Sequence, residues 1–464
     1  MNLKQIFYIT QIFFLCVEVG CAQNNLKEEG WNKLDEILNQ IVEPSFLLNE
    51  FNINDYGAIG DGLTDCSEAI KNAIHECNAA GGGKVVIPKG TFLTGPIYLK
   101  SNVNLYLSEN AIIKFSDDKT KYLPVVLTRW EGVECMNYSP LIYSFKEVNI
   151  AITGKGVLDG QGSDKNWWGW KGNKESGWIE GSPNQKKDRN DLFEMAENNV
   201  PPEKRVFGEG HYLRPSFVQP YQCKNVLIEG VTLKNSPMWF VHPVLCENVT
   251  IKNATIEGLG PNNDGCDSES SKNVLIKNCY FNTGDDCIAI KSGRNNDGRR
   301  INIPSENIVI QDCKMKEGHG GVVIGSEISG GAKNIFAENC VMNSPNLDRA
   351  IRIKTNAVRG GLIEYVYVRN IKIGQVKEAI IKINFYYEEG ANGNFLPVVR
   401  NLDFSNITSE KSEYAIWIKA FDKSPVTNIK LYDCVFNNVG KENLIENVDS
   451  MEIKNVIIND KEMN

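Results

Sequence analysis

The sequence predicts an all-β fold, a single-stranded right-handed parallel β-helix with a short helical cap at its N-terminal end. Three observations support this prediction. A short pattern, Asn followed by an aliphatic residue and then alternation, recurs from residue 225 onward. Each unit contains two or three short strands separated by Gly, Asn, Asp or Ser, and no helix of useful length interrupts the units. Irregular periods of about 20–50 residues filled with short strands are typical of a solenoid of β-coils.

The units begin with an asparagine in each case, at Asn225, Asn248, Asn273, Asn307, Asn334, Asn401 and Asn428, with a weaker copy at Asn102. Successive starts between residues 225 and 334 are 23, 25, 34 and 27 residues apart. An Asn at one corner of every coil suits stacked turns, because it tolerates left-handed geometry and can hydrogen-bond its neighbours along the stack. A propeller would need longer strands joined by hairpins, and the turn dipeptides of such hairpins are missing.

One β-helical domain is predicted over residues 51–464, preceded by a helical N-terminal extension over residues 23–50. Within the extension, residues 24–42 are expected to be helical because apolar side chains recur on one face, namely Trp31, Leu34, Ile37, Leu38 and Ile41. A second helix is expected over residues 67–80. Its place before the repeats makes it a natural cap for the open end of a solenoid.

Residues 1–22 are predicted to be a signal peptide. One basic residue, Lys4, precedes an apolar run over residues 6–17 that is too short to span a bilayer. Gly20-Cys21 resembles a lipoprotein box, and cleavage after Ala22 fits equally well. The protein is therefore expected to be exported, as a periplasmic, outer-membrane-associated or secreted protein. Its only expected membrane contact is a possible lipid anchor at Cys21.

The charge and cysteine content exclude some classes of protein. The 464 residues include 50 Lys and Arg against 58 Asp and Glu, a formal net charge of −8, which argues against a general nucleic-acid binder. Thirteen cysteines include no Cys-x-x-Cys pair, and only four histidines are present, so a zinc site is not expected. No cofactor is expected either. The eleven cysteines beyond residue 22 are expected to be free thiols packed as small apolar residues in a monomer.

Consecutive units carry polar groups at their corners, in the motifs Asn262-Asn263-Asp264-Gly265, Gly284-Asp285-Asp286, Gly318-His319-Gly320 and Arg352-Ile353-Lys354. Asp264 and Asp285 are 21 residues apart, about one coil, which predicts adjacent rungs of one face. Arg352 and Lys354 are two apart on a strand and so point to the same side.

This set of side chains has the chemistry of a glycoside hydrolase. Three stacked carboxylates repel one another, so at least one should have a raised pKa and keep its proton near neutrality. A carboxylic acid that protonates a leaving oxygen, beside a carboxylate that activates water, is the equipment for glycoside hydrolysis. The nearby Arg352 and Lys354 suit a substrate that carries its own carboxylate.

In this order, the four motifs resemble the signature of family 28 glycoside hydrolases, the polygalacturonases. The opening at residues 55–65 (DYGAIGDGLTD) also resembles the start of that β-helix, and the resemblance covers roughly residues 51–460. It implies a right-handed parallel β-helix that hydrolyses α-1,4-galacturonosyl linkages of pectin, with inversion and without a metal. The implied substrate is a pectic polysaccharide or an oligogalacturonide.

The same resemblance implies a role for each matching residue. Asp285 would be the general acid, while Asp264 and Asp286 would hold and deprotonate the attacking water. His319 would tune the acid and contact substrate. The galacturonate carboxylate would be bound by Arg352 and Lys354, and the family's downstream tyrosine falls on Tyr386, with Tyr387 as the alternative. An inverting mechanism predicts acid and base carboxyls about 6.5–9.5 Å apart.

Further substrate contacts are predicted at Asn262, Lys291 and Arg214. The loop at residues 294–300 (RNNDGRR) adds positive charge between the second and third motifs. It is expected either to bind a second acidic sugar or to be a solvated turn.

Residues 166–210 break the repeat and contain four tryptophans, Trp167, Trp168, Trp170 and Trp178. Two interpretations are open. Exposed tryptophans would stack on sugar rings and close one end of the cleft, or the aromatic side chains would cover the flank of the β-helix. A closed cleft would make the enzyme exo-acting, with release of single galacturonates from chain ends.

Three alternative functions are also open. The first is hydrolysis of rhamnogalacturonan or another uronic-acid-bearing pectin by the same family. The second is a pectate lyase, which would need calcium between carboxylates and an Arg or Lys base. The third is a β-helix that binds polysaccharide without catalysis, which the intact carboxylate trio disfavours.

Overall fold

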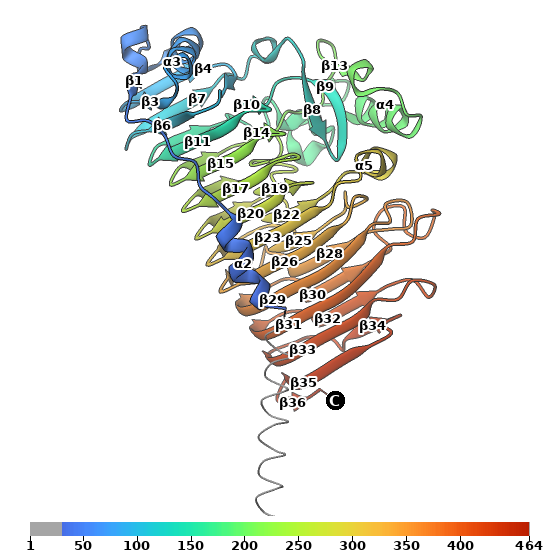
Figure 1. Cartoon of the computed structure of the whole chain (residues 1–464). Coiled ribbons are helices and arrows are strands. Elements are labelled where there is room, and N and C mark those ends of the chain that lie inside the picture. Colours follow the sequence, from blue (N-terminus) through green and yellow to red (C-terminus); the bar gives the residue numbers. More distant parts are fainter. Residues whose placement is uncertain (1–29, 464) are drawn as a thin grey trace, which may run out of the picture.

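The computed structural model describes residues 30–463, and these form a right-handed parallel β-helix that carries additional elements along one side (Figure 1). The predicted signal peptide, with Cys16 and Cys21, lies outside the described residues, as does the start of the predicted helical extension. Of the described helices, none is long and apolar enough to cross a membrane.

The strands stack in three ladders. The first contains β1 (Glu50–Asn52), β3 (Gly83–Ile87), β6 (Val103–Leu107), β11 (Val148–Gly154), β15 (Lys224–Glu229), β17 (Glu247–Lys252), β20 (Lys272–Lys277), β23 (Ser305–Gln311), β26 (Ala332–Glu338), β29 (Leu362–Gln375), β31 (Val398–Lys411), β33 (Thr427–Phe436) and β35 (Met451–Ile458). The second contains β2 (Asp61–Asp65), β4 (Gly90–Thr94), β7 (Ala111–Phe115), β12 (Val157–Asp159), β16 (Thr232–Lys234), β18 (Thr255–Gly258), β21 (Tyr280–Thr283), β24 (Lys314–Met315) and β27 (Val341–Met342). Strand β29 continues around the corner to pair with β27.

The third ladder carries the candidate site. It contains β5 (Ile97–Tyr98), β10 (Ile142–Phe145), β14 (Val218–Tyr221), β19 (Cys266–Glu269), β22 (Ile288–Lys291), β25 (Val322–Ile324), β28 (Arg349–Lys354), β30 (Ala379–Asn384), β32 (Tyr414–Lys419) and β34 (Leu444–Glu446). Isolated parallel bridges at Val241 connect β14 to β19. A short C-terminal strand, β36 (Lys461–Glu462), folds back antiparallel on β35.

In-register stacking of aliphatic side chains builds the core. Val274 and Ile276 of β20 pair with Ile308 and Ile310 of β23, and all four side chains are buried. Because every second residue of a strand points inward, each coil adds a layer of Ile, Val or Leu directly on the previous one. The eleven described cysteines are free and buried, as predicted for thiols packed as small apolar residues.

The corner asparagines form a ladder, as their repeat predicts, which is interrupted at Tyr365. Asn273 has left-handed backbone geometry (φ 56°), and its side-chain amide donates to Asn248 Oδ1 at 3.3 Å. It accepts a hydrogen bond in turn from Asn307 Nδ2 at 2.9 Å. Equivalent hydrogen bonds join successive corner asparagines from Asn102 to Asn334. Further along the chain, Asn428 donates to Asn401 in the same way. Asn tolerates this conformation at lower cost than other residues with a Cβ.

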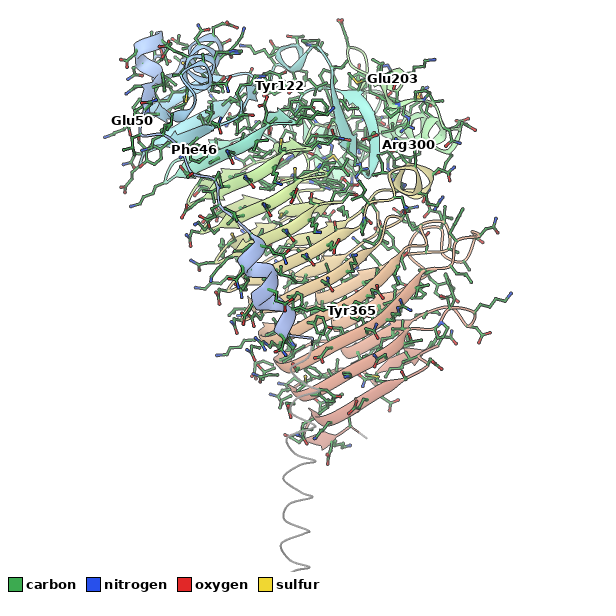
Figure 2. The ribbon with its side chains drawn as sticks, in the orientation of Figure 1. Phe46, Glu50, Tyr122, Glu203, Arg300 and Tyr365 are labelled. Carbon is green, nitrogen blue, oxygen red and sulfur yellow. The ribbon has the colours of Figure 1, made fainter. Side chains whose placement is uncertain are left out.

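Two helices occur where the sequence predicts them, with different roles. Helix α3 (Ser67–Ala79) buries its apolar face in the core at the N-terminal end of the coil, as expected of a cap. The described helix of the extension, α2 (Asn32–Gln40), lies across the outer face of the first ladder (Figure 1). Trp31, just before α2, packs against Phe336 and Tyr367 of that ladder. Figure 2 shows Tyr365 on the same side, where its ring meets Lys33.

A layer of irregular structure covers the N-terminal rungs of the third ladder. It consists of β8 (Val126–Trp130), β9 (Val133–Asn137), β13 (Val206–Phe207), α4 (Lys186–Glu197), α5 (Asn295–Ile301) and the 3₁₀ turns η2 (Lys119–Tyr122), η3 (Trp168–Lys171), η4 (Lys174–Ser176) and η5 (Pro202–Lys204). The remaining 3₁₀ turn, η1 (Ile53–Tyr56), precedes β2. In Figure 2, Glu203 and Arg300 mark this layer on the side of the molecule away from α2.

Candidate active site

A cavity of about 440 Å³ opens over the third ladder, beside the covering layer. Its floor and walls are strongly polar. Six of the residues predicted from the motifs line it, namely Asn262, Asp264, Asp285, His319, Arg352 and Lys354. The structure therefore brings side chains separated by about 90 residues of sequence into one site.

Strand register explains how the carboxylates meet. Cys266 pairs with Ile288 across β19 and β22, so Asp264 lies directly beside Asp286, and Asp285 is one residue further back. The next pairing, Ile288 with Val322, places His319 beside Asp285. One oxygen from each of the three aspartates lies within 4.8 Å of the others. Stacking at the rung spacing therefore concentrates three carboxyl groups in one spot.

Glycines make this close stacking possible. A Cβ on Gly284 would lie 2.2 Å from the carbonyl oxygen of Gly260 on the preceding coil. A Cβ on Gly320 would lie 2.4 Å from Val323 Cγ2 and 3.2 Å from Asp286 Oδ1. Since neither contact leaves room for a side chain, the corners that hold the aspartates and His319 need glycine at these positions.

Asp285 and His319 form a hydrogen-bonded pair, with 2.9 Å between Asp285 Oδ1 and His319 Nδ1. Burial alone would raise the pKa of Asp285, but the hydrogen bond and charge of His319, with Lys354 and Lys291 beyond it, hold that pKa below its usual range. The hydrogen bond to Asp285, followed by the charge of that carboxylate, raises the pKa of His319. In the free protein the proton of this pair therefore resides on the imidazole.

Asp264 behaves in the opposite way. It is 3% exposed, and its Oδ1 has no hydrogen-bond partner among the described residues. Burial, followed by the negative charges of Asp285 and Asp267, raises the pKa of Asp264 well above its usual value. The trio therefore contains the protonated carboxyl that like-charge repulsion predicts, and in the free protein it is Asp264 rather than Asp285.

Asp286 is held by the cationic pair. Lys354 Nζ donates to Asp286 Oδ2 at 2.7 Å, and Arg352 approaches Asp286 Oδ1 at 3.7 Å. Burial would lower the pKa of Lys354, but the charge of Asp286 outweighs it and raises that pKa. Both cations point to the same side of β28, as their spacing predicts, and remain on the cavity wall.

The tyrosine prediction was wrong about which of two neighbours faces the site. Tyr387 lines the cavity, and its ring lies 5.4 Å from the Arg352 guanidinium and 5.3 Å from Lys354 Nζ. Tyr386 is 44% exposed and packs outside the cavity against Phe421. Strand β30 ends at Asn384, so alternation along the strand no longer determines the side on which these two residues lie.

Arg214 was predicted to contact an anionic substrate, but it is completely buried and does not line the cavity. Its guanidinium donates to Gln185 Oε1, to the carbonyl oxygens of Pro237 and Pro261, and to Asn262 Oδ1 at 2.8 Å. All three of its guanidinium nitrogens thus donate to protein acceptors. Arg214 positions Asn262 rather than touching the cavity itself.

Lys291 does line the cavity, but its charge is already balanced. Its ammonium lies 2.9 Å from Glu327 Oε2, 3.5 Å from Asp267 Oδ1 and 4.6 Å from the centre of the Trp239 ring. The charges of Glu327 and Asp267 outweigh the effect of burial and raise the pKa of Lys291 well above its usual value.

The loop at residues 294–300 is not a solvated turn, and none of its residues lines the cavity. Most of it forms the helix α5, in which Asn295 and Asp297 are buried. Arg294 is 5% exposed and pairs with Glu327 and Glu388 at 3.3 and 3.2 Å. Because Arg294 is buried against these carboxylates, its positive charge binds protein groups rather than facing solvent.

The tryptophans of residues 166–210 do not line the cavity. Trp167 is completely buried and meets Trp170 edge to face at 5.1 Å, and Trp170 meets Tyr212 in the same way. Trp168 donates its Nε1–H to Ser236 O, and Trp178 donates to Ser182 O within its own segment. The interpretation that the tryptophans stack on sugar is therefore wrong, and the interpretation that they cover the flank is correct.

The segment nevertheless closes one end of the cleft. A separate apolar cluster joins Trp130 and Val133 of the β8–β9 hairpin to Leu192 of α4 and to Trp239. Tyr143 of β10 donates to Leu127 O, which shows that the hairpin lies directly on the face of the third ladder. The cleft therefore has a covered end at the N-terminal rungs, and no such layer covers β32 and β34 in the described part of the chain.

Sequence reasoning missed the cavity residues that come from this covering layer and from loops. They include Glu131, Lys171, Arg189, Trp239, Glu327 and Glu388. Arg189 joins two of them, with Arg189 Nε 2.8 Å from Glu131 Oε2 and Arg189 Nη2 3.9 Å from Glu388 Oε1. These residues lie outside any repeat, so no pattern in the sequence marks them. Only Glu327, three residues beyond β25, lies near a motif.

Two properties bear on the chemistry. The nearest oxygens of the trio, within 4.8 Å, are closer than the separation of about 6.5–9.5 Å expected for inversion. The trio has oxygens close enough to bind a cation, yet Lys354, Arg352 and His319 already place positive charge within reach of Asp286 and Asp285. This arrangement suits proton transfer and binding of an anionic sugar better than a calcium site.

Comparison with known proteins agrees with this geometry. Residues 207–456, more than half of the chain, match the model of glycosyl hydrolases family 28. Residues 50–122 match a model described as rhamnogalacturonase A/epimerase, pectate lyase-like. An exo-poly-alpha-D-galacturonosidase from Dickeya chrysanthemi is 28% identical over 468 residues, which cover 88% of this chain and 74% of that protein.

One solved structure has a higher sequence identity to this chain than that relative has. The exopolygalacturonase from Thermotoga maritima, described as hyperthermoactive, has a TM-score of 0.91 and 49% sequence identity. The match covers 94% of this chain and 97% of that one. A probable polygalacturonase from Vitis vinifera is 29% identical over 82% of this chain and 72% of its own length. The chain belongs to family 28 of the glycosyl hydrolases and is a glycosidase that hydrolyses O-glycosyl bonds.

Proposed function

We propose that the enzyme hydrolyses the α-1,4-galacturonosyl linkages of pectic galacturonan and that it acts from one end of the polymer. One observation carries the end-directed action. The cleft that holds the aspartates is covered at its N-terminal rungs by the β8–β9 hairpin and α4, so a chain can extend only toward the later rungs. The similarity to the exopolygalacturonase of Thermotoga maritima supports both the substrate and the mode of action.

The proposed chemistry uses the hydrogen-bonded pair as the proton donor. Asp285 transfers a proton to the glycosidic oxygen, and His319, 2.9 Å away, supplies that proton to Asp285. In the free protein, positive charge from Lys354 and Lys291 lowers the pKa of Asp285. A substrate carboxylate that approaches Lys354 offsets this charge, which raises the pKa of Asp285 toward that of a general acid.

The other two aspartates act on water. Asp264 and Asp286 lie side by side in the strand register, and Asp264 lines the cavity, so the attacking water is proposed to lie beside these two carboxyl groups. Asp286 is the member that pairs with Lys354 and Arg352, so it is the proposed base. The role of Asp264 is then to hold the water, which gives its proton to Asp286 as its oxygen attacks the sugar. We propose inversion on the basis of the family resemblance, with proton NMR of the first-formed product anomer as the test.

Product analysis tests the proposed function. De-esterified polygalacturonan is incubated with the enzyme in the presence of EDTA, and products are followed by reducing-sugar release and chromatography, with Asp285→Asn as the control. Galacturonate monomer as the first product, absent in the control, is the expected result. Mixed oligomers before monomer would contradict end-directed action. Unsaturated, ultraviolet-absorbing products that EDTA suppresses would identify a lyase instead.

We also propose that the protein is exported, because residues 1–22 have the pattern of a signal peptide and the substrate is an extracellular polymer. Mass determination of the mature protein after fractionation of the cells tests this. A mature chain that starts at Gln23 indicates simple cleavage, one that starts at a lipid-modified Cys21 indicates anchoring, and an intact Met1 contradicts export.

A further inference from the structure

The cavity has a positive group at each end, with the aspartates between them. Arg352 and Lys354 lie at the open side, with Tyr387 over them. Lys171 lies at the covered end, at the last position of η3, and comes from the segment that interrupts the repeat. We infer that Lys171 binds the carboxylate of the terminal galacturonate, so that a side chain from outside the repeat recognises the ionised form of that sugar. This inference rests on the proposed function and specifies its substrate.

Lys171 has a hydrogen bond but no ion pair among the described residues, and carboxylates act on its charge only from a greater distance. Its Nζ donates to Asn262 Oδ1 at 2.7 Å, and no carboxylate of the described residues forms an ion pair with it. Glu131, the carboxylate whose charge acts most strongly on Lys171, forms its ion pair with Arg189 instead, at 2.8 Å. Most other cations of the cavity wall are already paired, Lys291 with Glu327 and Arg349 with Asp348. Lys171 is thus a cation on the cavity wall without an ion pair among the described residues.

The surroundings hold this ammonium in place. Trp170, the residue before Lys171, is buried among Trp167, Tyr138 and Tyr212. Asn262, which accepts from Lys171, is fixed from behind by the buried Arg214 at 2.8 Å. A preorganised cation loses little conformational entropy when it binds an anion.

The direction of the pKa shift of Lys171 also favours binding of an anion at this position. Burial lowers the pKa of Lys171, and the positive charges of Arg214 and Arg189 add to that effect against the attraction of Glu131 and Asp285. A carboxylate bound at this position would remove the cost of keeping a desolvated ammonium charged. A neutral sugar would leave that cost in place.

Position decides which sugar Lys171 contacts. Asn262, its partner, lies in the coil of β19, the rung of the trio nearest the covered N-terminal end, so Lys171 reaches the site from the covered side. The cationic pair of β28 reaches it from the opposite side. The cleaved bond lies between them, and the sugar on the covered side is the terminal residue. Chains that end in rhamnose, in galactose or in a methyl-esterified galacturonate would lack the anion that Lys171 requires.

The test compares two trigalacturonates, one fully ionised and one with a methyl ester on the terminal residue that the wild-type enzyme releases. Wild-type enzyme is expected to prefer the ionised form by about 10–100-fold in kcat/KM, the size of one charge-assisted hydrogen bond. Lys171→Met should reduce that preference to less than about 3-fold, and Lys171→Arg, which keeps the charge, should retain much of it. Lys174→Met, an exposed lysine of the same segment, is the matched control and should keep the wild-type preference.

Each outcome bears on a different claim. Because the preference is a ratio within one variant, partial unfolding of Lys171→Met cannot produce its loss. If Lys171→Met keeps the wild-type preference, or if wild type shows none, the inference is overturned while the proposed function stands. If wild-type enzyme hydrolyses neither trigalacturonate, the proposed function itself fails.

Discussion

Two corners of the coil are built by the same device and differ in charge. At the first corner, asparagines stack in register and each amide donates to the next, as Asn273 does to Asn248. At the corner before the third ladder, aspartates stack in register, as Asp264 does on Asp286. Neutral amides both donate and accept, so repetition satisfies them, whereas ionised carboxylates only accept and repel one another.

The difference separates the part of the repeat that stabilises the fold from the part that performs chemistry. The asparagine ladder has a partner on each side along most of its length. The aspartate stack has unpartnered oxygens on Asp264 and Asp286, and the pKa of Asp264 is raised. Strongly shifted pKa values and unsatisfied buried groups concentrate where reactants bind. Substitutions at the two corners should therefore have opposite effects.

The largest effect is expected for Asp264→Asn. This substitution replaces one carboxyl of the aspartate stack with the neutral amide found in the asparagine ladder. Loss of the carboxyl that holds the water should reduce kcat by about 10³-fold, within the range of general acid–base contributions. Stability should not fall. In wild type, Asp264 keeps a proton in the native state that it loses in the unfolded chain above about pH 3.9. Its contribution to the free energy of unfolding therefore declines as pH rises from this value toward the raised pKa of the native state.

The variant lacks that decline, so its thermal midpoint at neutral pH should equal or exceed that of wild type. Calorimetry from pH 4 to pH 8, beside steady-state kinetics, checks both parts. A variant that is less stable than wild type across this whole range would show that the carboxyl of Asp264 is ionised in the native state.

The asparagine ladder should respond in the opposite way. Asn273→Ala removes two side-chain hydrogen bonds and leaves an alanine in left-handed geometry, so it should lower the free energy of unfolding by about 3 kcal/mol. Asn273→Gly relieves the backbone strain and should recover about 1 kcal/mol of this loss. Denaturant unfolding measures both, and kcat per folded molecule should be unchanged. An equal loss of activity in the folded fraction would couple this corner to the site.

His319→Gln tests whether Asp285 and His319 act together as the general acid, or whether Asp285 acts alone. A glutamine can still contact Asp285 but cannot hold the proton, so the basic limb of the kcat/KM profile should move to lower pH by about one unit or more. The rate at the new optimum should fall by about 10–100-fold. If the limb does not move, Asp285 holds its proton without help from the imidazole.

The smallest effect separates two adjacent tyrosines. Tyr387→Ala should raise KM by about 10-fold, because the ring that covers Arg352 and Lys354 is lost. Tyr386→Ala should change KM by less than about 2-fold, since its ring packs on Phe421 outside the cavity. A larger effect at Tyr386 than at Tyr387 would reverse the assignment made from the structure.

The sequence alone was sufficient to predict the coil, the asparagine ladder and the cap helix, because the solenoid repeats locally and each unit carries its own strands and corner. It also identified Asp264, Asp285, Asp286, His319 and the cationic pair, since residues at equal places in stacked coils must become neighbours.

Only the tertiary structure decided what the non-repeating segments do. Residues 166–210 and the loop at residues 294–300 follow no period, so nothing in their order shows that they fold back over the third ladder. Burial there gave Arg214 and Arg294 protein partners and left Lys171 without an ion pair among the described residues. Whether a charged side chain binds substrate or protein depends on the groups packed around it, and in this chain those groups come from distant parts of the sequence.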